Sequence, residues 1–172
     1  MYGLPMPAQI YSPELDTFIP EGSRLRAMVI WLTSYFQHGD LSTRDTNIIE
    51  YVVPATSRQP SIYNMSQKDM TEIIEEAPYS AFDTPMALNC MPQTHAVYER
   101  ANFDKSIKAL LPHLKIWVLT GGATLSFPIA ALWTIQDDEK AHGCNDINYK
   151  MLPHMNHFVS LILLINGVYS RY

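Results

Sequence analysis

The feature that most constrains the fold of this chain is a pair of strand patterns with a helix pattern between them. Residues 114–120 form an apolar, β-branched and aromatic run that stops at a glycine pair, as a buried parallel strand does. Residues 147–152 alternate apolar and polar side chains, and Pro153 then prevents a central ladder from continuing. Between them, residues 126–142 carry apolar side chains at helical spacing. The sequence therefore predicts a βαβ unit with parallel strands.

The part of the chain before Pro112 carries helical patterns separated by clear breaks. Residues 1–20 contain several prolines and few periodic apolar residues, so we expect an irregular segment there. Spacings of three and four, together with prolines and glycines that end them, predict helices over residues 24–38, 43–53, 66–76, 79–90 and 94–111. Ser66 and Asp69 resemble a capping box, with Asp in place of the usual Glu or Gln. The expected fold class is α/β, with a mainly helical region followed by a βαβ unit of a parallel sheet.

The second predicted strand leads to a histidine that is suited to catalysis. His157 follows Pro153 closely, so it should lie on the loop at the carboxyl end of this strand. A histidine in such a place titrates near neutral pH and can reach a nucleophile. His157 is therefore our candidate general base. The simpler interpretation is that it is one of six histidines and lies on a turn.

This order of elements resembles the C-terminal part of an α/β-hydrolase-fold protein of the AB hydrolase-1 type that carries a helical cap. The resemblance runs to about Phe158 and is most specific at residues 112–122 and 147–158. It implies that residues 1–112 form the cap, that residues 113–172 form the C-terminal portion of the hydrolase core, and that His157 occupies the family's general-base position. Six aromatic side chains would then roof a pocket for a small-molecule substrate, unless they simply pack in a core: Trp31, Tyr35, Phe36, Tyr63, Tyr79 and Phe82.

Two parts of the family's catalytic site are missing from the sequence. None of the seven glycines belongs to a glycine-x-serine-x-glycine elbow, so the nucleophile would lie upstream of Met1. Thr124 stands where many relatives carry an aspartate, and threonine holds no charge beside an imidazolium. The acid could instead follow an earlier strand or be Asp137 or Asp138, although these two are typical of a solvated helix end. If strands are missing, one edge of strand 114–120 should be unpaired and one of its faces uncovered.

Composition excludes several other classes of function. The net charge of −5 and the pI near 5.6 give no basic surface for nucleic acid. Two cysteines and the lack of a secretory signal pattern favour a reducing, cytoplasmic location. The spacing of His142, Cys144, His154 and His157 fits no standard zinc pattern, and no phosphate loop follows the first strand. We therefore expect neither a metal nor a cofactor.

The C-terminal segment departs from the family. Residues 158–169 are mostly aliphatic, yet twelve residues are too few for a membrane span, which needs about twenty. The abrupt loss of periodicity favours sequence unrelated to the family, as an altered reading frame or an unspliced segment would give, over a buried element or an interfacial anchor. Two functions remain open: a truncated hydrolase whose complete form would cleave a small ester, amide or similar substrate with His157 as base, or a non-catalytic helical binding protein.

Overall fold

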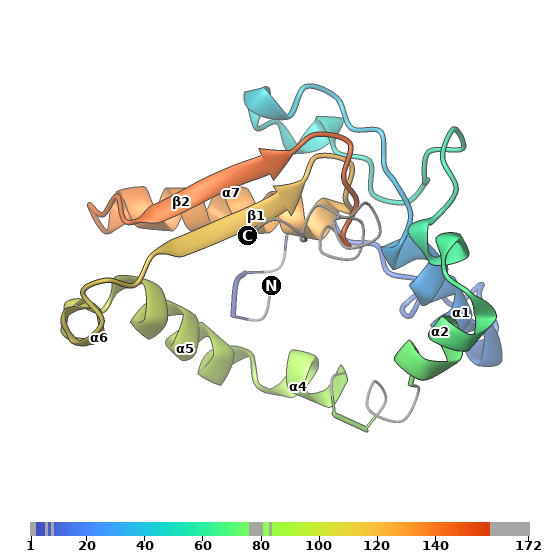
Figure 1. Cartoon of the computed structure of the whole chain (residues 1–172), viewed down its shortest axis with the longest axis horizontal. Helices are drawn as coiled ribbons and strands as arrows, with labels where there is room; N and C mark the ends of the chain where they lie inside the picture. Colours follow the sequence, from blue (N-terminus) through green and yellow to red (C-terminus); the bar gives the residue numbers. More distant parts are fainter. Residues whose placement is uncertain (1–2, 6, 8, 76–80, 83, 159–172) are drawn as a thin grey trace.

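A two-stranded parallel sheet with one crossover helix forms the centre of the structure, a computed structural model that describes residues 3–5, 7, 9–75, 81–82 and 84–158. Strand β1 (Ile116–Gly121) pairs with β2 (Ile147–Leu152), and helix α7 (Ser126–Ala141) connects them (Figure 1). The register places Ile116 beside Ile147 and Gly121 beside Leu152. This arrangement confirms the predicted parallel βαβ unit and the coarse α/β class. β1 begins two residues later than expected.

Helix α7 covers one face of this sheet and leaves the other face open. Val118 of β1 and Tyr149 of β2 pack against a buried cluster that includes Ile129 and Trp133 of α7. On the opposite face, Trp117 is 56% exposed and Leu119 is 53% exposed. Among the described residues β1 pairs with β2 alone, so its other edge is free, as expected if neighbouring strands are missing. An apolar edge without charge or proline is a site for association with other chains.

We expect the isolated chain to self-associate through this open face, and Leu119→Glu to reduce that association. The new carboxylate would lie beside Lys150, the register partner of residue 119, so stability should change by less than about 1 kcal/mol. Sedimentation velocity at increasing protein concentration would measure the effect. Phe18→Glu is the matched control, because Phe18 is 95% exposed and lies far from the sheet in sequence. A wild-type chain that remains monomeric at every concentration would contradict the expectation.

The part of the chain before β1 is helical, but its helices are shorter than the sequence predicts. The α-helices with described bounds are α1 (Glu21–Leu32), α2 (Gln67–Ile73), α4 (Thr84–Asn89), α5 (Met91–Phe103) and α6 (Lys105–Leu110). Ser66 caps α2 as predicted, since its hydroxyl accepts from the Asp69 amide and donates to the Asp69 carboxylate. The predicted helix 94–111 is two helices, because Asp104 accepts from the amides of Ser106 and Ile107 and begins α6. Part of the predicted helix 79–90 lies outside the described residues.

Of the helices predicted in the first half of the chain, one is too long and another is wrong. The helix predicted over 24–38 ends at Leu32, where the hydroxyls of Thr33 and Ser34 donate to carbonyls of the last turn. The helix predicted over 43–53 is replaced by two short 3₁₀ turns, Leu41–Thr43 and Thr46–Ile48. Each turn begins at an aspartate whose side chain accepts from the amide two residues later, which favours a turn over a helix.

The aromatic residues expected to roof a pocket serve mainly as core. Trp31 and Phe36 are buried with Leu125 in one cluster, and their rings meet edge to face at 5.9 Å. Tyr35 is buried, whereas Tyr63 and Phe82 are exposed and Tyr79 lies outside the described residues. The pocket-roof interpretation is therefore wrong for the three buried rings. Because Leu125 follows β1, this cluster joins α1 to the carboxyl end of the sheet. The predicted boundary between a cap and a core at residue 112 stays a prediction.

Candidate functional site

The loops after β1 and β2 interlock at the carboxyl edge of the sheet. The amide of Gly122 donates to the Leu152 carbonyl at 2.8 Å, and the amide of Ala123 donates to the Met155 carbonyl at 2.9 Å. A β-carbon at Gly121 would lie 2.6 Å from the Asn156 carbonyl oxygen and would collide with that of Met155. The glycine is therefore required for this close approach of two backbones.

Asn156 fixes the residue before the candidate base. Its side chain is fully buried, and its amide nitrogen donates to the Thr33 carbonyl at 2.6 Å and to Ser61 Oγ at 2.9 Å. Its oxygen accepts from the amide of Phe158 at 3.0 Å. Because this buried side chain makes three hydrogen bonds, it strongly constrains the position of the loop. The backbone is thus held on both sides of His157.

His157 itself is exposed on this loop, which is where the sequence predicts it. Its ring meets Phe158 edge to face at 5.4 Å. Desolvation by neighbouring atoms lowers the pKa of His157 below its ordinary value, although solvent reaches the exposed residue and limits this effect. No serine, cysteine or aspartate side chain among the described residues is hydrogen-bonded to His157. Within the described part of the chain, the structure therefore presents an accessible imidazole that no nucleophile or acid is hydrogen-bonded to.

The positions considered for the acid do not supply one. Thr124 is fully buried, and its hydroxyl has no hydrogen-bond partner among the residues that the structure describes. Asp137 pairs with Arg44 at 2.7 Å, and Asp138 accepts from the Tyr98 hydroxyl at 2.7 Å. Both aspartates lie in the second half of α7, near the end that leads into β2 and away from the carboxyl edge of the sheet. The alternative that either one orients His157 is therefore wrong.

Sequence reasoning missed a second histidine near this edge. His38 is half-buried, and its Nε2 lies 2.7 Å from the Thr124 carbonyl, while its Nδ1 accepts from the Glu50 amide at 2.9 Å. Burial lowers the pKa of His38. In the sequence His38 reads as the end of a helix, and its partners are 12 and 86 residues away. No local pattern could have identified this role.

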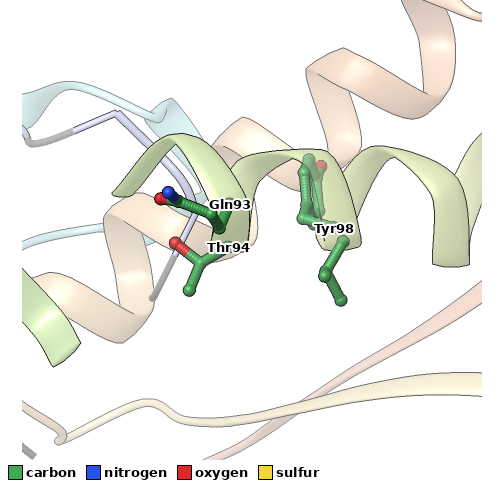
Figure 2. A pocket seen from close by; sticks show the side chains of 4 residues that line it. Gln93, Thr94 and Tyr98 are labelled. Atoms are coloured by element: carbon green, nitrogen blue, oxygen red, sulfur yellow. The ribbon is translucent and has the colours of Figure 1, made fainter. Parts of the chain in front are cut away.

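Two hollows of the described structure have linings that do not include His157. One, of about 300 Å³, lies on α5 and is lined by Gln93, Thr94, Val97 and Tyr98 (Figure 2). Another, of about 270 Å³, lies near the start of β1, and its lining includes Lys108 and Asp146, which form an ion pair at 2.6 Å. Neither is lined by a candidate catalytic residue. His157 itself is exposed at the carboxyl edge of the sheet.

The described residues also hold no cluster of three or more His, Cys, Asp or Glu side chains that could bind a metal ion. His142 stacks on Phe103 with ring centroids 4.2 Å apart and lies 3.3 Å from the Glu99 carboxylate. These contacts join the end of α7 to α5, so His142 serves in packing the two helices together. Within the same described ranges, no helix is long and apolar enough to cross a membrane.

Comparison of the chain with protein-family models, with curated proteins and with solved structures finds no match. The resemblance to α/β-hydrolases therefore depends on the order of elements and on the residues quoted above. A function can therefore be inferred only from the geometry at the carboxyl edge of the sheet.

Proposed function

We propose that this chain is the helical cap and C-terminal core portion of an α/β-hydrolase, with His157 as its general base. The observation that supports this most is the position of His157 on a clamped loop directly after the second of two parallel strands. Ligands and catalytic groups of open α/β sheets gather at the carboxyl ends of the strands. The free edge of β1 is where a further core strand would pair, and its open face, with Trp117 and Leu119, is where other parts of a complete core would pack.

In this mechanism the imidazole of His157 moves one proton. It would accept the proton of a serine nucleophile as the oxygen attacks the carbonyl carbon, and would then return that proton to the leaving group. Asn156 would keep the loop from shifting, since its three hydrogen bonds tie the backbone beside His157 to Thr33 and Ser61. The 172 residues contain no elbow, so the nucleophile would come from a longer product that includes this chain.

A second candidate is a non-catalytic binding protein. The observation that favours it is the loop after β1, where the buried Thr124 occupies the position at which the family carries its acid. Without an acid, an imidazolium would lack the charge that stabilises it. The coding sequence upstream of Met1 distinguishes the two functions. An elbow in frame supports the hydrolase, and a frame without one supports the binding protein.

We expect the purified 172-residue chain to release product from an activated ester no faster than free imidazole at the same concentration of histidine side chains. A base without its nucleophile retains little of the acceleration of a catalytic triad. The measurement is p-nitrophenyl acetate hydrolysis followed by absorbance, with the His157→Ala variant as background. Turnover that exceeds the free-imidazole rate and that His157→Ala abolishes would reveal a nucleophile within these residues and contradict the proposal that it comes from elsewhere.

A further inference from the structure

His38 joins two segments that are distant in the chain, using both of its ring nitrogens. The Thr124 carbonyl, in the loop after β1, lies 2.7 Å from Nε2, and the Glu50 amide donates to Nδ1 at 2.9 Å. The ring lies parallel to that of Phe36, with a centroid distance of 6.3 Å and an interplanar angle of 10°. The amide of Phe36 donates to the Ala123 carbonyl at 2.9 Å, beside the same loop.

These two contacts are compatible with one protonation state. The nitrogen that accepts from an amide must carry a lone pair, so Nδ1 is unprotonated and the proton is on Nε2, which donates to the carbonyl. An imidazolium carries N–H groups at both positions, and its Nδ1–H would meet the N–H of Glu50 directly. Protonation therefore replaces a hydrogen bond with the close approach of two donors.

The charged surroundings of His38 do not restore that bond. Glu50 is the charged group that acts on the imidazole, and its carboxylate accepts from the amides of Val53 and Val52 at 2.9 and 3.0 Å. These two amides lower the pKa of the Glu50 carboxyl, so it keeps its charge in mildly acidic solution. Both amides donate to one carboxylate oxygen, Oε1, and the backbone N–H of Glu50 still faces Nδ1.

We propose that His38 is a pH-operated clasp: the neutral imidazole holds the loop after β1 to residues 36–50, and protonation releases it. The released segment includes Ala123, whose amide bonds to Met155 in the loop that carries His157. Acidification would therefore weaken the contacts between the loops at the carboxyl edge before it weakens the pairing of β1 with β2. This property belongs to the described fold and holds whether or not the chain is part of a hydrolase.

The direction of the pH effect follows from the lowered pKa of His38, which burial causes. The open or unfolded chain binds the proton more readily than the closed chain does. The clasp therefore contributes its full stability above the ordinary histidine pKa of 6.5 and loses it as the pH falls below that value. The test must therefore read out this contact by itself.

Hydrogen exchange followed by mass spectrometry on the whole chain, at low concentration, provides that readout. After correction for the intrinsic exchange rate, protection of the Glu50 amide should fall roughly three- to tenfold between pH 7.5 and 5.0, the effect of losing one ordinary hydrogen bond. Peptides from α7 should keep their protection. In His38→Gln, whose side chain supplies a donor and an acceptor but does not titrate, the Glu50 amide should be equally protected at both pH values.

His113→Gln is the matched control, because His113 is exposed at the other end of β1 and should leave the wild-type pH dependence intact. Two results would overturn the clasp. One is wild-type protection that is unchanged between the two pH values. The other is a His38→Gln chain that loses protection with pH as the wild type does, which would assign the effect to another group.

Discussion

Gly121→Ala should destabilise the chain by at least about 3 kcal/mol, the range reached when a substitution forces strain into a packed backbone. The added β-carbon would collide with the carbonyl of Met155 and lie 2.6 Å from that of Asn156. Neither carbonyl can move freely, because the Met155 oxygen accepts from Ala123 and the Asn156 side chain is bonded to Thr33 and Ser61. The substitution must therefore separate the two loops at the carboxyl edge.

Urea unfolding followed by circular dichroism would measure this loss. Gly22→Ala is the matched control, because nothing lies within 4 Å of its added β-carbon and the residue is in helix α1. Alanine is the better helix former, so the control should be neutral or stabilise by up to about 1 kcal/mol. Equal unfolding midpoints for Gly121→Ala and the wild type would show that the two loops do not pack as described.

The parts of the fold that local chemistry determines could be predicted from the sequence. Strand β2 was predicted to the residue, because its alternation and the following Pro153 specify both the strand and its end. Helix α7 was predicted to within one residue, since its apolar spacing and its polar end are both local. The start of α2 followed from Ser66, whose capping bond reaches only to Asp69.

One error in the helix predictions occurs where a long-range contact overrides local spacing, and another where aspartate side chains form local turns. The apolar pattern of α1 continues to Phe36, yet the chain leaves the helix after Leu32 because the Phe36 amide bonds to Ala123, 87 positions later. That bond does not appear in any local window. Residues 43–53 contain apolar side chains at helical spacing, but two aspartates form turns through their own side chains, and this preference outweighs the weak pattern.

The candidate site also has a part that could be predicted from local sequence and a part that could not. His157 could be placed on a loop after the strand, because the strand and its proline are local features. Asn156 and Gly121 could not be recognised, since their importance comes from partners that the fold brings together. Thr33 is 123 positions away from Asn156, and the carbonyl that fixes Gly121 belongs to the other strand's loop.

The second prediction with a large effect concerns the loss of the proposed general base, His157. In a longer product of the same frame that carries a nucleophile elbow, His157→Ala should lower kcat for ester hydrolysis by roughly 10⁴- to 10⁶-fold, as removal of a triad histidine does. KM should change little, because the imidazole acts on the proton and contributes little to substrate binding. The exposed loop position of His157 makes the alanine variant compatible with the fold, which urea unfolding can verify.

The most direct test of the hydrolase proposal is this kcat ratio, measured beside His113→Ala in the same product. His113 is exposed before β1, so its replacement should leave kcat within about twofold of the wild type if the loss is specific to the base. A collapse of kcat in His157→Ala alone is the predicted result. Equal activity of the two variants, or an upstream frame without an elbow, would contradict the account and favour the binding protein.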